Sequence, residues 1–332
     1  MSEPHARRTV AVLLATYNST RFIAEQVASL ARNRTPFTLH WVDDGSSDST
    51  VQSVEAEARR HAIALHRHHA AHRLGVPEAF FHLLANVEAD VYLFCDHDDI
   101  WEDGKIDYTV EAMDARVPMF CFSEPKLFTS GSSEAPKPFF EVLGVSAAEA
   151  LDIRRALLFN PAVGNTVAVN RPLRELYRQH AHTLRRGAAM HDWWLYLLAR
   201  AAGEVRLLER CPTTLYRQHA ANTLGVRMPG TRRGVEDAWQ RHKRYRLTVA
   251  RQAQAFLQVA ATLERNPMLD ALVRSANLVS QVAQRQNLAL ITRLLRLRCT
   301  PIGALRSAFF LGGCLLSDAQ ARGEPGTPAS VS

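Results

Sequence analysis

Three carboxylates lie within four positions, directly after a run of apolar residues. The run Val91–Cys95 has the composition of a buried strand, and Asp96, Asp98 and Asp99 follow it. Carboxylates this close repel one another and raise one another's pKa unless a cation lies between them. Oxygen ligands of this kind suit Mg²⁺ or Mn²⁺, which commonly bridge protein carboxylates and the phosphates of a substrate. The cluster therefore indicates either a metal–diphosphate site or an acidic turn that solvates a strand end.

The segments around this cluster alternate between the patterns of strands and helices. Short apolar runs indicate strands buried on both faces, and apolar residues at helical spacing separate them. The predicted strands are Thr9–Ala15, Phe37–Val42, Ala62–His66 and Val91–Cys95, and the predicted helices are residues 21–31, 49–61 and 77–87. The order β-α-β-α-β-α-β is typical of a parallel sheet covered by helices, so the fold class is α/β.

Polar residues follow three of these strands. Thr16, Tyr17 and Asn18 end the first strand, and Asp43 and Asp44 end the second. In open α/β sheets, ligands bind outside the carboxyl ends of the strands. The three loops should therefore converge on one crevice, which favours the metal–diphosphate interpretation of the acidic cluster over the solvated turn.

The rest of the chain predicts further strands and then a helical region. The predicted strands are residues 119–122, 161–170, 204–208 and 213–218, with an irregular loop over 129–140 and a helix over 192–202. Glycines between residues 225 and 234 indicate a boundary. We expect a catalytic domain over residues 1–228 and a basic, mainly helical region over 229–332, with a disordered tail from about residue 318.

Composition narrows the class of protein. The chain has 332 residues, 47% hydrophobic and 22% charged, which is ordinary for a soluble globular protein. Its five cysteines are scattered without zinc spacing and indicate reduced thiols in a cytoplasmic protein. No signal-peptide pattern and no apolar run of about 18 residues is present in this sequence, so a membrane-spanning helix is not expected.

The excess positive charge lies in the last third of the chain. Residues 231–332 contain 15 Lys or Arg and 6 Asp or Glu. Between residues 284 and 316, arginines alternate with leucines and phenylalanines, as in an amphipathic helix on the inner, anionic face of a membrane. The same pattern fits a helix packed on the catalytic domain or on a second subunit of a homodimer. No nucleic-acid-binding fold is recognisable, so nucleic acid is not an expected partner.

A family likeness rests on motifs that occur in order over residues 9–225. They are Val10–Asn18, Trp41–Thr50, Asp96–Trp101 with Lys105 and Ile106, Gly164–Thr166, His191–Trp194 and Leu215–His219. The chain resembles a family 2 glycosyltransferase of the GT-A fold, and within that family the rhamnosyltransferase-like enzymes of bacterial surface polysaccharide synthesis. The resemblance implies a Rossmann-like mixed sheet covered by helices, with the C-terminal helical region as an extension.

The resemblance also implies an inverting transfer of a sugar, such as rhamnose, from a dTDP- or UDP-linked donor. The acceptor would be a glycan or a lipid-linked oligosaccharide. Asp96 and Asp98 match the DxD pair that holds Mg²⁺ or Mn²⁺, and the metal offsets charge on the departing diphosphate. Residues assigned to the nucleotide and diphosphate are Thr16, Tyr17, Asn18, Asp43, Asp44, Arg73, Asp96 and Arg217, with Asp43 favoured for the base. His219 is a further candidate metal ligand.

On the acceptor side, Asp192 matches the catalytic carboxylate of the family. Inversion requires a base that takes the proton of the acceptor hydroxyl, opposite the leaving group. The predicted helix N-terminus should keep Asp192 ionised. Residues assigned to substrate binding are Asp99, Trp101, Gly164, Asn165, Thr166, His191, Trp193 and Trp194, with one of the two tryptophans expected in the core and one under a sugar ring.

Two other activities are possible on a similar sheet. A nucleotidyltransferase that makes nucleotide-sugars normally needs a glycine-rich, basic loop after the first strand, where this chain has Thr16–Thr20. A glycan- or nucleotide-binding protein with an inactive site is the other alternative, and the presence of Asp96, Asp98 and Asp192 argues against it.

Overall fold

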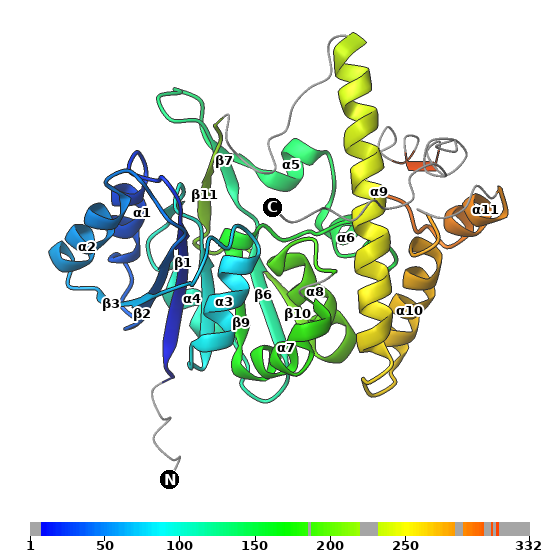
Figure 1. Ribbon diagram of the computed structural model, residues 1–332, viewed down its shortest axis with the longest axis horizontal. Helices are drawn as coiled ribbons and strands as arrows, with labels where there is room; N and C mark the ends of the chain where they lie inside the picture. Colours follow the sequence, from blue (N-terminus) through cyan, green and yellow to red (C-terminus); the bar gives the residue numbers. More distant parts are fainter. Residues whose placement is uncertain are drawn as a thin grey trace, which may run out of the picture.

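A seven-stranded mixed sheet lies at the centre of the protein (Figure 1). The structure is a computed structural model, and it describes residues 8–184, 187–219, 232–282, 288–301, 307, 310 and 311. The strand order is β10 (Glu204–Leu208), β6 (Met119–Ser123), β9 (Val167–Asn170), β4 (Val91–Cys95), β1 (Val10–Thr16), β2 (Thr38–Asp43) and β3 (Ala64–His68). β9 runs antiparallel to β4 and β6, and the other pairs are parallel.

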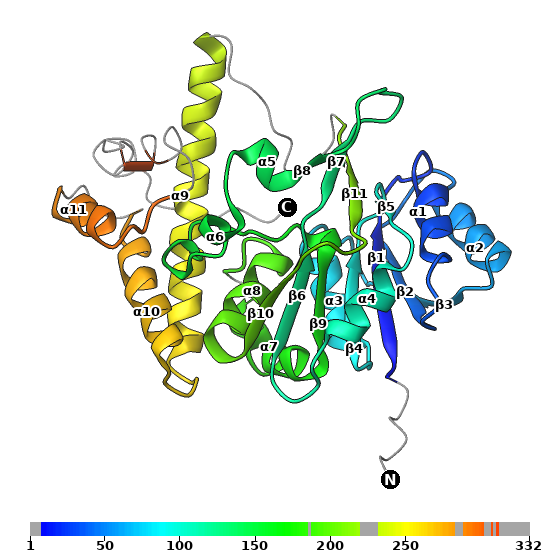
Figure 2. The ribbon, with the colours of Figure 1, turned by 180° about the vertical axis from the view of Figure 1, so that it is seen from behind.

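Helices cover both faces of this sheet, as the apolar composition of its central strands requires. Every residue of β1 and β4 is buried, so each strand contributes side chains to two hydrophobic layers. One layer is formed with α1 (Ile23–Leu30), α2 (Thr50–Arg60) and α4 (Lys105–Ala112), and the other with α3 (Glu78–Asn86), α7 (Arg171–Leu184) and α8 (His191–Ala202). The two layers lie on opposite sides of the sheet in Figure 2.

The predicted convergence of the polar strand ends is confirmed for the first two strands by direct contacts. β1 lies between β4 and β2, so the ends of all three strands are adjacent. The Thr16 hydroxyl donates to Asp43 Oδ1 at 2.8 Å, and the buried Trp41 indole donates to Thr16 Oγ1 at 2.9 Å. The Asp44 amide donates to the Thr16 carbonyl at 2.8 Å. These contacts fix the first two loops relative to each other before any ligand binds.

Two segments differ from the sequence prediction. Residues 161–170 were expected to form one strand, but Gly164–Thr166 is a short 3-10 turn (η2) and only Val167–Asn170 is extended. The Thr166 hydroxyl donates to the Val163 carbonyl at 2.8 Å and closes that turn, a local bond that competes with strand pairing. The helix α7 was not predicted.

The second difference concerns the last strand of the catalytic region. Residues 213–218 do not close the main sheet, because β11 (Thr214–Arg217) belongs to a second sheet. That sheet has the order β5 (Ile100–Trp101), β11, β7 (Lys126–Phe128) and β8 (Lys137–Pro138). In this sheet β5, which follows Asp99, lies beside β11, which precedes His219. The pairing of these two strands brings the acidic loop close to His219.

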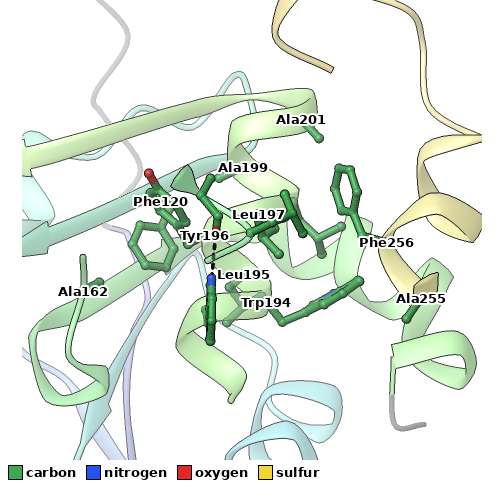
Figure 3. Packing of buried hydrophobic residues seen from close by; sticks show 14 of the residues in the cluster. Phe120, Ala162, Trp194, Leu195, Tyr196, Leu197, Ala199, Ala201, Ala255 and Phe256 are labelled. Carbon is green, nitrogen blue, oxygen red and sulfur yellow. Dashed lines mark hydrogen bonds between the residues drawn. The ribbon is translucent and has the colours of Figure 1, made fainter. Parts of the chain in front are cut away.

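The C-terminal helices share a core with the catalytic region. They are α9 (Arg232–Ala260), α10 (Pro267–Val279) and α11 (Leu288–Arg296). The Trp194 ring of α8 packs edge-on against Phe256 of α9, with centroids 6.4 Å apart (Figure 3). The Gln252 side chain of α9 accepts a hydrogen bond from the Ala189 amide at 3.0 Å. Within the described residues, no helix is long and apolar enough to cross a membrane.

The shared core predicts that α9 stabilises the catalytic region. Phe256→Ala should lower the free energy of unfolding by about 3–5 kcal/mol, because it removes a fully buried ring between two helices. Leu247→Ala on the exposed side of the same helix is the control and should change it by about 0.5 kcal/mol or less. Chemical unfolding of both variants measures the difference. Equal effects would mean that α9 does not pack on α8 in solution.

Candidate active site

The acidic loop after β4 contacts the segment after β11. His219 Nε2 lies 2.8 Å from Asp98 Oδ2, and the His219 ring stacks on Phe22 with centroids 5.2 Å apart. His219 and Asp98 are 121 residues apart in the chain, so the second sheet brings them together. The structure thus places the predicted third metal ligand beside the DxD pair.

The Asp96 carboxyl experiences strong electrostatic strain. Its pKa is raised to about 8, mainly by burial and also by the negative charges of Asp98 and Asp192, against an opposing effect of Lys105. A carboxylate in this position is stabilised by a nearby cation. The same effect shows that Asp192, from the other side of the site, lies near enough to Asp96 to influence its ionisation.

These residues fit a divalent cation in part. Donor atoms 2.8 Å apart, as in Asp98 and His219, match neighbouring positions around an ion whose bonds are about 2.1 Å long. Asp96 would gain from the added positive charge. Within the described ranges, however, no three His, Cys, Asp or Glu side chains already surround one point suited to a metal ion. The remaining ligands would have to come from a substrate's phosphates, which Mg²⁺ sites commonly use.

The loops after β1 and β2 carry the residues that the sequence predicts to bind the nucleotide. The Arg73 guanidinium lies 3.7 Å above the Tyr17 ring, and its Nε is 3.6 Å from Asp44 Oδ2. Asp44 also accepts hydrogen bonds from the Leu74 and Gly75 amides. Tyr17 is exposed and presents an aromatic face beside Arg73, which suits a planar base or a phosphate.

Asp43 and Asn18 are held by their own loops. The Asp43 carboxylate accepts bonds from the Thr16 hydroxyl, the Ser46 hydroxyl and the Ser46 amide. Asn18 has a left-handed backbone with φ of 47° and accepts the Ser47 amide at 2.9 Å. Each Asp43 oxygen already has a donor, so a nucleotide base would have to bind at the remaining lone pairs.

Asp192 begins α8, as the sequence predicted, but its ionisation differs from the expectation. Its Oδ1 accepts the Trp193 amide at 2.6 Å, which favours the ionised form as a helix N-terminus should. Burial outweighs that effect and raises the Asp192 pKa to about 7. The sequence argument omitted desolvation because the depth of the helix start is a tertiary property. A carboxylate with this pKa is a stronger base than an ordinary aspartate.

The lack of a side chain at Gly164 allows α8 to pack closely against the turn η2. A Cβ at this position would lie 3.0 Å from His191 Nε2 and 3.6 Å from Asp192 Oδ2. His191 is buried against the rings of Phe80 and Phe94, with centroids 4.3 and 4.9 Å away. Burial lowers its pKa to about 3, so His191 is a neutral packing residue behind the base rather than a charged substrate contact.

Both tryptophans after the base lie in the core, which corrects the expectation that one would support a sugar ring. Trp194 is fully buried against Phe256. Trp193 is 8% exposed, and its indole donates to the Ala156 carbonyl at 2.7 Å. On a helix covered by the sheet and by α9, neighbouring positions can both face protein, which a single-helix argument does not anticipate.

Four more predicted site residues are enclosed by the protein. Asp99, Trp101 and Asn165 are fully buried, and Arg217 is nearly so. The Arg217 guanidinium donates to the Asp98 carbonyl at 2.6 Å and to Glu25 at 2.6 Å, and it also contacts Ser130. These bonds correct the assignments to diphosphate and substrate: the residues support the loops that carry the site. Thr166 is buried in the same turn.

Several residues that shape the site were not singled out from the sequence. Phe22 stacks on His219, Glu25 pairs with Arg217, and Asn160 donates to Asp192. Phe22 and Glu25 lie in a helical pattern that indicated only packing. Their partners are nearly 200 residues away, so no local spacing could reveal them.

The main sheet has the GT-A fold that the motifs predicted, and two solved structures confirm it. Staphylococcus aureus TarS, residues 1–349 with UDP-GlcNAc, superposes with a TM-score of 0.52 at 17% identity, covering 92% of this chain and 89% of that one. The mannosyltransferase PcManGT of Pyrobaculum calidifontis, with GDP-Man and Mn²⁺, gives 0.50 at 17% identity, covering 94% and 87%. At these identities the likeness is one of fold.

Sequence comparison supports the family that the motifs predicted. Residues 11–150 match the model of glycosyl transferase family 2. The chain is also 23% identical over 257 residues to the dTDP-rhamnosyl transferase RfbG of Shigella flexneri, covering 73% of this chain and 84% of RfbG. A second relative, Protein RfbJ of Shigella flexneri, is 29% identical over 94 residues, covering 28% of this chain and 67% of RfbJ.

The raised pKa of Asp96 predicts that this carboxylate destabilises the metal-free protein at high pH. Because folding raises this pKa, the unfolded chain binds fewer protons, and stability is lost as pH rises towards about 8. With a chelator at a pH of about 8.5, the melting temperature of Asp96→Asn should be about 2 °C or more above that of wild type. At a pH of about 5.5 this difference in melting temperature should be smaller. Mn²⁺ should stabilise only wild type. A gap that is constant with pH would contradict this account.

Proposed function

We propose that this protein is a metal-dependent, inverting glycosyltransferase that uses a nucleoside-diphosphate sugar. The observation that supports this best is the proximity of two acidic groups from different elements. Asp96 and Asp98 follow β4 beside the loops after β1 and β2, while Asp192 lies in the first turn of α8 beside Gly164. Asp192 is near enough to raise the pKa of Asp96. One group can serve the leaving diphosphate and the other the incoming hydroxyl.

The residues of this chain divide the reaction between them. Asp192 takes the proton of the acceptor hydroxyl, and its raised pKa of about 7 makes it a better proton acceptor than an ordinary aspartate. Tyr17 and Arg73 hold the nucleotide and diphosphate side of the donor. Asp96, Asp98 and His219 would hold Mg²⁺ or Mn²⁺, which when bound offsets the charge on the leaving diphosphate. Attack from the Asp192 side, opposite the diphosphate, gives inversion.

The donor is proposed from the relative of known activity. RfbG is a dTDP-rhamnosyl transferase and matches most of this chain, so a dTDP- or UDP-linked deoxysugar such as rhamnose is the first donor to test. The acceptor would be a glycan or lipid-linked oligosaccharide of a bacterial surface polysaccharide. The match to a glycosyltransferase family favours transfer over a nucleotidyltransferase or an inactive binding protein.

The function can be tested by a donor screen with variants of the base. Wild type should hydrolyse or transfer one nucleotide-sugar in the presence of Mn²⁺. Asp192→Asn should lower kcat by about 10²–10⁴-fold, with nucleotide–Mn²⁺ affinity within about twofold, because it removes only the proton acceptor. Asp103→Asn, at an exposed ion pair with Arg32, is the control and should be fully active. An active Asp192→Asn enzyme would exclude the base assignment.

The pH dependence offers an independent check of the base within the same assay. At saturating donor and metal, kcat should fall about tenfold per pH unit below about 7, since only ionised Asp192 accepts the proton. A kcat that stays level down to a pH of about 5.5 would contradict the raised pKa.

A further part of the proposal is that the enzyme is cytoplasmic and contacts the inner face of the membrane through α11. The buried face of α11 packs inward with Leu290, Ile291 and Leu294. Within the described residues, Leu288 and Leu295 of this helix and Leu297 just after it are exposed, as are Arg293 and Arg296. Arginines beside apolar side chains suit an anionic lipid surface. Arg285, Arg306 and Phe309 of the predicted amphipathic segment lie outside the described residues, as does the tail from residue 318.

Vesicle sedimentation tests the membrane contact. The full chain should sediment with phosphatidylglycerol vesicles and less with neutral ones. The double variant Arg293→Gln, Arg296→Gln should lose about 30-fold in affinity, at about 1 kcal/mol per charge. A matched change of Arg59 and Arg60 on α2 should have no effect. A wild-type chain that stays in the supernatant would disprove the contact, and a dimer that dissociates in the α11 variant would assign the same face to a second subunit.

A further inference from the structure

Lys105 is a buried lysine that the proposed chemistry does not use. It begins α4 and is only 2% exposed. Its ammonium lies 3.4 Å above the Trp101 ring and donates to the Asn165 carbonyl at 3.0 Å. A buried lysine is costly unless its charge is compensated by specific partners, so a site with such partners requires an explanation.

Asn165 connects Lys105 to the acidic loop. Its carbonyl oxygen accepts a second bond, from the Thr214 hydroxyl at 2.9 Å. Its side-chain amide donates to Asp99 Oδ2, and Asp99 Oδ1 accepts the Arg217 amide at 2.9 Å. Lys105, Asn165, Thr214 and Asp99 are each 2% exposed or less, so water competes little for these bonds.

The two ends of this buried network lie at the two halves of the site. At one end, Arg217 Nε donates to the Asp98 carbonyl at 2.6 Å and so fixes the loop that carries the DxD pair. At the other end, Asn165 belongs to the same short turn as Gly164, against which His191 and Asp192 pack. Lys105 therefore binds Asn165, the residue that connects the loop of Asp98 and Asp99 to the turn at Gly164.

The chemistry of lysine suits this position. An apolar side chain of similar length, such as methionine, could fill the volume, but it would leave the Asn165 carbonyl with the Thr214 hydroxyl as its remaining side-chain donor. It would also remove a basic group from beside the buried carboxyls of Asp96 and Asp99. The turn and the acidic loop would then be free to shift relative to each other.

We propose that Lys105 is a positioning residue that sets the distance between the donor-binding loop at Asp98 and the base at Asp192. This inference rests on the proposed function, because the distance matters only if both halves act in one reaction. Misplacement by about 1 Å of a reacting group can cost about 100-fold in rate. A positioning role therefore affects kcat more than the binding of either substrate.

The test compares variants along the network with a distant lysine. Lys105→Met should lower kcat about tenfold or more per folded molecule, while the Kd of the nucleotide–Mn²⁺ complex changes by about twofold or less. Thr214→Val removes the other donor to Asn165 with little change of shape, and should lower kcat less than Lys105→Met does. Lys137→Met, at an exposed pair with Glu134, is the control and should keep full activity.

The concentration of folded enzyme is determined from the stoichiometry of nucleotide binding, and kcat is calculated per folded molecule. A variant that is partly unfolded is therefore not mistaken for one with a lower kcat. If Lys105→Met does not fold, the result for Thr214→Val decides. A lowered melting temperature with kcat per folded molecule within about twofold of wild type in the variants that fold would overturn the proposal, since it would leave a purely structural role. A wild-type enzyme with no transfer activity on any donor would instead refute the proposed function.

Discussion

Burial of negative charge at the ends of parallel strands is the constraint on which the site depends. Asp96, Asp99 and Asp192 all have raised pKa values, and burial is the largest cause for each. Charged groups are expensive to bury, so each of these carboxylates needs donors or a cation. The loops, the second sheet and the buried lysine supply hydrogen-bond donors and positive charge near these carboxylates.

The carboxylates meet the need in different ways. Asp99 is satisfied within the protein by Asn165 and the Arg217 amide, and is withdrawn from the cleft. Asp98 has His219 as its neighbour and remains near the surface. Asp96 has like charges around it, which leaves it the most dependent on an added cation. One acidic cluster thus contains a structural member and members suited to ligand binding.

The second sheet provides the means of bringing these partners together. β11 pairs with β5 directly after the acidic loop, and the chain then leads to Arg217 and His219. Glu25 of α1 and Ser130 beyond β7 hold the Arg217 guanidinium from two other directions. The helices after residue 231 complete the support, because α9 covers the buried tryptophan beside Asp192. The catalytic and C-terminal regions therefore share one hydrophobic core.

Local sequence patterns determined the order of strands and helices, the polar strand ends and the family. Apolar runs and helical spacing report burial along each element, and they located β1, β2, β4 and α8 to within two residues. The DxD motif and Asp192 were singled out from their family motifs, and in the structure Asp192 lies near enough to Asp96 to raise its pKa.

Only the tertiary structure decided which of the candidate residues are enclosed by the protein. Trp193, Trp194, Asp99 and Arg217 carry the residue types of a binding site, yet contacts with distant elements enclose them. The ionisation of Asp192 was likewise decided by the tertiary structure, because desolvation raises its pKa by more than the amide at the helix N-terminus lowers it. Side-chain burial in a loop or at a helix start depends on neighbours far away in the chain, and no local period encodes those neighbours.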